Sequence, residues 1–312
     1  MSYRYDAIGN MTYKSDIGSY DYGYNAPHQV SSIGAKKFIY DSNGNMTNND
    51  GTKIEYTSFN KPSKITTPKT TIRFTYDTNK NRYKKDTNKY TSYYLGKSYE
   101  KTIHTSGVVE DKYFIYVGGK VVSIYTNKKE NSISKPSTKY LHYDSLNSVD
   151  TITNNLGVVE SRMAYKPFGE KLQLDKDGNP TSKASYTNRG YTGHEHIEET
   201  KYINMNARLY DPTIARFLSA DSIIPAMYDT QGFNRYSYVK NNPLKYTDPS
   251  GHSWLSKTWK KATKWLKNNW KSIVTVGLSI LVGSWVIGAF ASVGVYGAPA
   301  KSYTPVIEYP LL

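Results

Sequence analysis

The sequence contains no cysteine, and its first 251 residues contain no tryptophan. Disulfide bonds therefore play no part in the fold, and cysteine usage gives no information about the redox compartment. No signal peptide is recognised, because the opening MSYRYDAIGN already resembles the repeats that follow. Before residue 252 there is also no apolar stripe of helical period that lasts three turns. A long helical domain is therefore not expected in this part of the chain.

Tyrosine is the residue that the sequence has in excess, with 31 tyrosines against 8 phenylalanines among 312 residues. Tyrosine favours strands and has a polar tip, which suits a half-buried sheet whose side chains reach water. The hydrophobic content of 38% is enough for a core. The length allows one large β domain and a small second module.

The net charge of +15 is unevenly distributed along the chain. Residues 252–312 carry seven lysines against a single acid, Glu308, and they also hold all five tryptophans. Such an abrupt change in composition is typical of a domain boundary. We therefore expect a different module to begin near residue 252.

A short tyrosine-aspartate motif recurs before that boundary, with copies that begin at residues 5, 40, 76, 143 and 210. Successive copies are 35, 36, 67 and 67 residues apart, close to one or two units of a single length. Each copy predicts a strand that ends at tyrosine, followed by a turn in which Asp and Gly-Asn tolerate positive φ. The clearest positions are Tyr5, Asp6, Gly9, Asn10, Tyr40, Asp41, Gly44, Asn45, Tyr76 and Asp77.

Other local signals support a mainly β fold. Gly118-Gly119 predicts a hairpin between 113–117 and 120–125, and Asp177–Pro180 predicts a turn. A short helix is expected near Ile197–Asn204. His194, Glu195 and His196 do not form a metal-binding H-E-x-x-H motif, and a solvated turn is expected there.

The repeats and the motifs that follow them resemble the Rhs/YD-repeat family with its Rhs-associated core. The ordered motifs are Tyr191–Glu195, then ARLYDPTIARFLSAD, NRYSYVKNNP and DPSG. The positions that carry the core resemblance are Arg208, Tyr210, Asp211, Pro212, Arg216, Phe217, Asn234, Tyr236, Asn242, Pro243, Pro249 and Gly251. Their arginines are expected to pair with core carboxylates or to stack on tyrosine.

The resemblance implies a spirally wound, hollow shell of β-hairpins that encloses a variable C-terminal toxin. Because this chain has few repeats, we expect a partial cocoon with a short α-helical C-terminal module. The implied domains are a YD-repeat shell at 1–190, an Rhs-associated core or plug at 191–251, and a variable module at 252–312.

Two aspartates carry the only chemistry that the resemblance implies. The family's core ends in two Asp-Pro-x-Gly motifs whose aspartates act as an intramolecular aspartyl protease that cuts once. Here the second motif, Asp248–Gly251, is intact, whereas the first keeps only Asp221. The implied cleavage region contains His252, Trp254 and Leu255. The simpler alternative is that both aspartates are turn residues whose side chains bond to nearby backbone N–H groups.

The tail begins with a basic amphipathic pattern. Apolar residues recur at helical spacing from residue 255 to 270, with lysines on the opposite face. Tryptophan opposite lysine suits anionic lipid headgroups, so membrane contact is expected at Trp259, Lys260, Lys264, Trp265 and Trp270. An uncharged run at 273–295 would reach about 35 Å as a helix, which is enough to cross a bilayer. The alternative is a buried helical hairpin in a soluble toxin domain.

Two functions from different classes follow from these observations. The first is the carrier end of a polymorphic toxin that encloses a small membrane-active module and releases it by self-cleavage. The second is a cell-surface YD-repeat protein that is structural or binds carbohydrate and has a C-terminal membrane anchor. The expected partners are a lipid bilayer, an immunity protein, a secretion system and carbohydrate, whereas nucleic acid, a cofactor and a metal are not expected. A secreted or cell-surface location, with membrane association, is expected.

Overall fold

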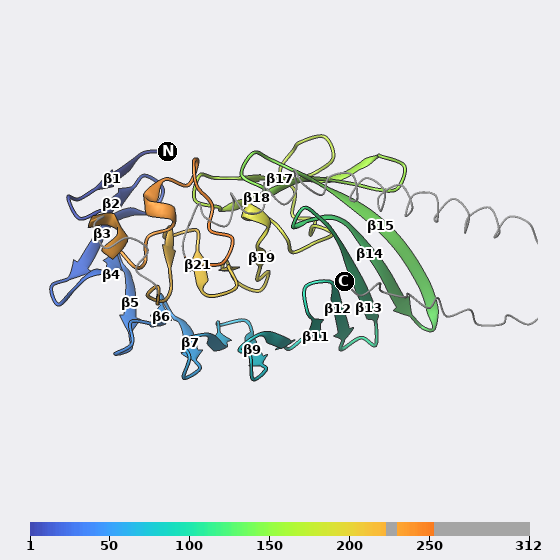
Figure 1. The fold of residues 1–312 in the computed structure, drawn as a ribbon, viewed down its shortest axis with the longest axis horizontal. Coiled ribbons are helices and arrows are strands. Elements are labelled where there is room, and N and C mark those ends of the chain that lie inside the picture. Colours follow the sequence, from blue (N-terminus) through green and yellow to red (C-terminus); the bar gives the residue numbers. More distant parts are fainter. Residues whose placement is uncertain (223–229, 253–312) are drawn as a thin grey trace, which may run out of the picture. The chain divides into compact units, whose positions relative to one another are not determined.

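Eighteen strands form a single sheet in which each strand pairs antiparallel with the next one in sequence (Figure 1). The structure is a computed structural model that describes residues 1–222 and 230–252. The first nine strands are β1 (Tyr3–Tyr5), β2 (Met11–Lys14), β3 (Gly18–Gly23), β4 (Ala26–Ile33), β5 (Lys36–Tyr40), β6 (Met46–Asn49), β7 (Thr52–Tyr56), β8 (Pro62–Thr66) and β9 (Thr71–Tyr76). The other nine are β10 (Arg82–Asp86), β11 (Tyr90–Leu95), β12 (Tyr99–His104), β13 (Val109–Val117), β14 (Lys120–Glu130), β15 (Ile133–Tyr143), β16 (Val149–Thr153), β17 (Val159–Tyr165) and β18 (Lys171–Leu174).

The turns between strands confirm the predicted tyrosine-aspartate unit. Asp41 Oδ1 accepts hydrogen bonds from the backbone N–H groups of Asn43 at 2.9 Å and Asn45 at 2.8 Å. The Asn45 side chain donates in turn to Asp41 Oδ2, at 2.9 Å. Gly44 has a φ of +80°, which glycine adopts without steric cost. The turn at Asp6 has the same bonds, so one local sequence builds the same turn twice.

Tyrosine hydroxyls connect neighbouring strands beside these turns. Tyr56 donates to the carbonyl of Met46 at 3.1 Å, and Tyr76 donates to that of Pro62 at 2.7 Å. Tyr22 and Tyr165 donate in the same way to the residues that open β2 and β16. The phenol ring packs in the sheet while its tip satisfies a backbone carbonyl, which explains why the repeats use tyrosine and not phenylalanine.

The sheet curls so that its first hairpin meets the turn between β17 and β18. Lys14 is only 1% exposed, and its Nζ lies 2.8 Å from Asp16 and 2.6 Å from Glu170. Lys166 bonds to the same two carboxylates, each at 2.9 Å. Two lysines and two acids therefore join segments that are about 150 residues apart in the sequence.

Residues 187–222 and 230–252, here called the inner segment, lie between the two ends of the curled sheet (Figure 1). They form a four-stranded sheet and three 3₁₀ turns: β19 (Glu195–His196), β20 (Ile203–Asn204), β21 (Leu209–Asp211), β22 (Arg216–Phe217), η1 (Tyr191–Gly193), η2 (Thr230–Phe233) and η3 (Val239–Asn241). Their apolar side chains share one buried cluster with residues of β2 to β9. The inner segment therefore covers the apolar face of the early strands.

The mainly β class and the hairpin at Gly118-Gly119 are confirmed, whereas the short helix expected near Ile197–Asn204 is wrong. Those residues instead form the turn that leads from β19 to β20, closed by bonds between the backbones of Ile197 and Tyr202 and of Thr200 and Ile197. Pairing of Ile203 with His196 supplies β bonds that a helix of this length cannot offset. The predicted helical module at 252–312, including Trp254, Leu255 and the membrane-contact residues, lies outside the described residues apart from His252. Within the described residues no helix is long and apolar enough to span a bilayer.

Replacing Tyr56 with Phe is expected to lower the free energy of unfolding by about 1–2 kcal/mol, because the Met46 carbonyl loses a donor in a partly buried place. Urea denaturation of the variant and the wild type measures this difference. Tyr24→Phe is the matched control, because Tyr24 is fully exposed. Equal losses in the two variants would contradict the assigned role of the hydroxyl.

Candidate functional site

The inner segment contacts the curled sheet of eighteen strands, here called the shell, at the same turns that define the repeats. Asn234 and Asn241 both donate to the carbonyl of Gly9, at 3.0 and 2.8 Å, and Tyr236 donates to that of Gly44 at 2.8 Å. A Cβ at Gly44 would lie 2.5 Å from the Tyr236 hydroxyl. The NRYSYVKNNP motif therefore docks onto the first two repeat turns, and the glycine there is required for close approach as well as for backbone conformation.

Two later turns are contacted in a similar way. The backbone of Gly190 accepts from Val149 N at 3.1 Å, and Thr192 N donates to Ser148 Oγ at 3.1 Å. Tyr191 and Tyr210 donate, each at 2.9 Å, to the carbonyls of Pro167 and Phe168 in the turn between β17 and β18. The inner segment is thus fixed to four turns from both ends of the sheet.

Arg208 lies at the centre of the contacts that hold the end of the inner segment. Its Nη2 is 2.8 Å from Asp221 Oδ2 and 3.6 Å from Asp248 Oδ2, so the two predicted aspartates are brought to one guanidinium. The three side chains are at most 7% exposed. Arg208 Nε donates to the carbonyl of Gly251 at 2.5 Å, and its Nη1 donates to that of Arg235 at 3.0 Å. Its guanidinium carbon also lies 3.6 Å from the centre of the Phe217 ring.

Burial lowers the pKa of Arg208 to about 10, and the charges of Asp221 and Asp248 oppose this change by favouring the cation. At neutral pH the guanidinium is therefore charged. A cation next to two carboxylates offsets the repulsion that would otherwise keep them apart. The arginine thus allows the two aspartates to share one dry site.

The Asp248–Gly251 motif forms a tight turn. Asp248 Oδ1 accepts from Gly251 N at 2.9 Å and from Ser250 N at 3.3 Å, which is the turn role considered as the simpler alternative. Gly251 has a φ of +75°, and a Cβ there would lie 2.1 Å from the Met205 carbonyl oxygen. No side chain can be accommodated at this position without moving the backbone of the inner segment.

The residue after this turn reaches the first aspartate. His252 Nδ1 is 3.4 Å from Asp221 Oδ1 and 3.5 Å from the Ser222 hydroxyl, and His252 N donates to Ser250 Oγ at 3.2 Å. Gly251 and His252 therefore contact Asp248 and Asp221 respectively, and the guanidinium of Arg208 binds the Gly251 carbonyl. Such a group of charges can activate water and polarise an amide.

The His194–His196 stretch is buried, so the prediction of a solvated turn is wrong. Glu195 is 2% exposed and forms an ion pair with Arg82 of β10, and Tyr94 donates to it at 3.4 Å. Burial by itself would raise the pKa of Glu195, but Arg82 and Lys85 outweigh this and lower it to about 2. Side chains of β10 supply the charges that allow Glu195 to be buried, and the local sequence around residue 195 contains no sign of them.

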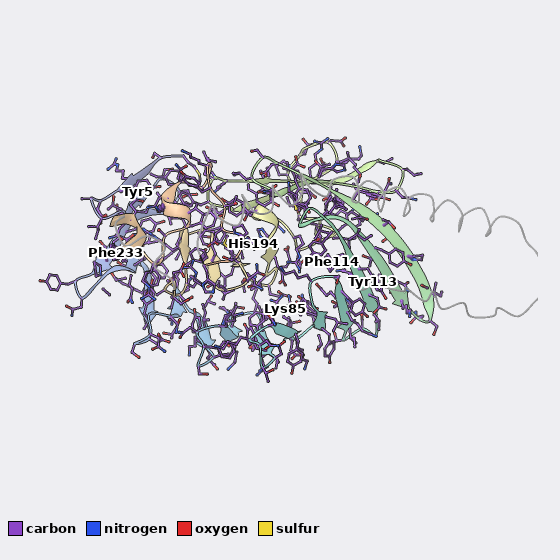
Figure 2. All side chains as sticks on the ribbon, viewed as in Figure 1. Tyr5, Lys85, Tyr113, Phe114, His194 and Phe233 are labelled. Carbon is purple, nitrogen blue, oxygen red and sulfur yellow. The ribbon has the colours of Figure 1, made fainter. Side chains whose placement is uncertain are left out.

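Both histidines of this stretch are buried and hydrogen-bonded, and Figure 2 shows His194 among the side chains inside the sheet. His196 Nε2 accepts from Tyr191 N at 3.0 Å, and His194 Nε2 is 2.8 Å from the Asp248 carbonyl. Burial lowers the pKa of His194, and burial followed by repulsion from Lys171 lowers that of His196 to about 3. Within the described part of the chain no three His, Asp or Glu side chains come close enough to hold a metal ion.

The remaining core residues have structural partners. Arg216 is 1% exposed and donates to the Tyr22 hydroxyl at 2.7 Å, an expected pairing with tyrosine. Asp211 accepts from Asn49 at 2.8 Å, and burial raises its pKa.

The other motif positions differ in burial. Pro212 follows β21 and is buried, as is Pro243, whereas Asn242 and Pro249 are exposed. Arg235 donates to the backbone carbonyl of Asp221 at 2.5 Å.

Acidification is expected to destabilise the shell through His196. Its pKa is about 3 in the fold and about 6.5 when unfolded, so the unfolded chain binds the extra proton and stability falls as pH drops from about 6.5 towards 3. His196→Gln is expected to lower the melting temperature at pH 7.5 but to reduce the further loss between pH 7 and 5. Thermal denaturation across this range measures both effects.

His142→Gln is the control for this experiment, because His142 is exposed. It should retain the pH dependence of the wild type. A decline in the His196→Gln variant as steep as that of the wild type would assign the acid sensitivity to other groups.

The profile of the teneurin YD-shell family matches residues 1–244. The tRNA3(Ser)-specific nuclease WapA of Bacillus spizizenii is 28% identical over 270 residues, which cover 82% of this chain and 11% of that protein. The tRNA nuclease WapA of Bacillus subtilis is 28% identical over 283 residues, with the same coverage of both. The chain therefore spans about one tenth of the length of these curated relatives.

Among solved structures, the complex of TcdB2 and TccC3 without its hypervariable C-terminal region has a TM-score of 0.65 and 19% sequence identity. The match covers 80% of this chain and 13% of the other. This likeness concerns the fold, and it agrees with a curled antiparallel sheet that is built from hairpins. With the family profile covering more than three quarters of the sequence and the repeat turns in place, the chain belongs to the teneurin YD-shell family.

Proposed function

We propose that this chain is the carrier end of an Rhs-type polymorphic toxin, in which the inner segment closes the shell and the residues after 252 are the released module. The relatives named as tRNA nucleases and the fold of the TccC3 complex support a toxin shell. The observation that carries the proposal is the junction itself. Arg208 binds the carbonyl of Gly251, and the same guanidinium contacts the two aspartates that the motif resemblance singled out.

The proposed reaction is one hydrolytic cut in the chain between His252 and Ser256. One carboxylate takes a proton from water as the water oxygen adds to the amide carbonyl, and the other carboxyl, in its protonated form, donates to the carbonyl oxygen. The C–N bond then breaks and the amine leaves with a proton.

Arg208 positions the groups in this scheme. Its Nε bond to the Gly251 carbonyl fixes the backbone just before the proposed cut, while its Nη2 contacts both carboxylates. His252 is within 3.4 Å of Asp221 and directs the first residue of the cleavage region towards that carboxylate. A chain held in this way requires little further ordering before it reacts.

The proposal predicts that the full-length protein converts to two fragments, and that Asp221→Asn and Asp248→Asn each slow this at least 100-fold. The amide keeps the shape of the side chain but cannot serve as a base. Denaturing gels follow the conversion over time, and mass spectrometry of the smaller fragment locates the cut between His252 and Ser256.

Asp211→Asn is the matched control, because Asp211 is a buried acid of the same inner segment that bonds to Asn49 and not to Arg208. It should cut at the wild-type rate as long as it remains folded. Intact full-length bands in the wild type and in both aspartate variants would rule out self-cleavage and leave the two aspartates with the turn and ion-pair roles seen in the fold.

For the released module we propose action on membranes, from the lysine and tryptophan pattern and the uncharged run of its sequence. A peptide of residues 253–312 is expected to release carboxyfluorescein from vesicles that contain anionic lipid, and to do so less from neutral vesicles. A peptide with Lys260 and Lys264 changed to Gln should be weaker on the anionic vesicles only.

The same assay separates the two functions that the sequence allows. Binding to vesicles without release of dye would favour a membrane anchor, and with it a surface protein that displays its tyrosine-rich shell. Release of dye supports a toxin, which would also require an immunity protein in the producing cell and a secretion system for export.

A further inference from the structure

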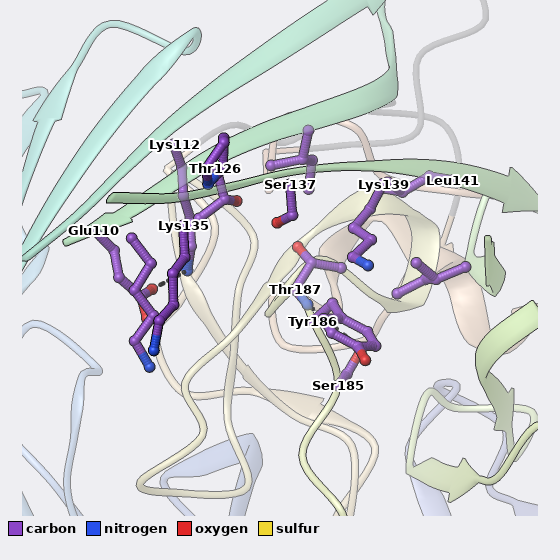
Figure 3. Close-up of a pocket in the computed structure, with 14 residues that line it drawn as sticks. Glu110, Lys112, Thr126, Lys135, Ser137, Lys139, Leu141, Ser185, Tyr186 and Thr187 are labelled. Atoms are coloured by element: carbon purple, nitrogen blue, oxygen red, sulfur yellow. Dashed lines mark hydrogen bonds and ion pairs between the residues drawn. The ribbon is translucent and has the colours of Figure 1, made fainter. Parts of the chain in front are cut away.

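A pocket of about 480 Å³ lies on one face of strands β13 to β16, and none of the residues that line it belongs to the Arg208 site (Figure 3). Ser185, Tyr186 and Thr187 close its other side. Figure 3 shows the side chains of both walls pointing into the same space. The pocket has no part in the function proposed above.

Four lysines line this pocket because strands present alternate side chains to one face. Lys112 comes from β13, Lys128 from β14, and Lys135 and Lys139 from β15. Lys128 and Lys135 are direct partners in the strand register. Like charges placed opposite each other in a sheet repel, so this pair of lysines destabilises the sheet at this position.

The carboxylates nearby compensate for only part of this charge. Lys112 is 3.2 Å from Glu110, Lys135 is 3.3 Å from Glu130, and Lys139 is 2.5 Å from Glu160. Lys128 forms no ion pair with any described residue. Of these acids only Glu110 lines the pocket, against the four lysines. The pocket therefore has an excess of positive charge that an anion would relieve.

The rest of the lining favours a compact ligand with oxygen acceptors. Thr126, Ser137 and Thr187 bring three hydroxyl groups to the space between the lysines. Ile124, Leu141 and Ile152 form an apolar floor. The Tyr186 ring lies 4.6 Å from Lys139 Nζ and forms part of the wall.

We propose that this pocket binds a small anion that carries two or more linked phosphate groups. Lysine ammonium groups and hydroxyls are common donors to phosphate oxygens. No arginine lines the pocket, so there is no planar fork to match a carboxylate in two bonds. The volume is in the usual range for a small-molecule site.

Sodium tripolyphosphate is the probe, added to the full-length protein in calorimetric titrations at constant ionic strength. We expect saturable binding with a stoichiometry near one, and at least tenfold weaker binding by Lys128→Gln/Lys135→Gln. The control is Lys129→Gln/Lys37→Gln, which removes the same charge from exposed positions, one of them the neighbour of Lys128 on the opposite face of β14. It should bind like the wild type.

Three results would overturn the proposal. One is the absence of saturable binding, and another is an equal loss of affinity in the two double variants, which would show only an effect of net charge. The third is equally tight binding of tricarballylate or of hexaglutamate, which would assign the pocket to carboxylates. Melting curves of both double variants establish that each is folded.

Discussion

A single-layer sheet that curls must bury its concave face against something, because hairpins stacked in sequence leave that face open to water. Here the chain's own inner segment covers that face, and its apolar side chains share one buried cluster with residues of β2 to β9. The contacts at the repeat turns then fix the position of the inner segment. The glycine and asparagine of each turn thus shape the hairpin and also expose the carbonyl onto which Asn234 or Tyr236 docks.

Burial of charge is the second consequence of filling the shell with polypeptide. Glu195 is accommodated by Arg82, and Asp221 and Asp248 by Arg208, so each of these three buried acids has a cation supplied from another part of the chain. Removing one member of such a group leaves the other unpaired in a dry site, which costs far more than the pair contributes. We therefore infer that these networks act mainly by specifying where the inner segment sits.

The repeat turns could be predicted from the sequence because the bonds that shape them, such as those between Asp41 and Asn45, join residues only four positions apart. The hairpin at Gly118-Gly119 could be predicted for the same reason. The burial of Glu195 could not, since it depends on Arg82, which is 113 residues away, nor could the docking of Asn234 on Gly9, over 225 residues. The helix expected near Ile197–Asn204 was wrong because strand pairing inside the shell outweighed local preference. The approach of Asp221 to Asp248 was suggested by motifs alone, and the arginine that contacts both was expected only to pair with core carboxylates or to stack on tyrosine.

The order of the strands has a consequence for how the protein is made. Since every strand of the large sheet pairs with the one before it, each hairpin can form as soon as it leaves the ribosome. The inner segment is translated after all eighteen strands of the large sheet, and its bonds, such as that from Asn49 to Asp211, close loops of more than 160 residues. We expect a nascent intermediate whose unfilled wall exposes Met11, Met46 and Ile54, so that chaperone capture during synthesis is greatest just before residue 200 emerges.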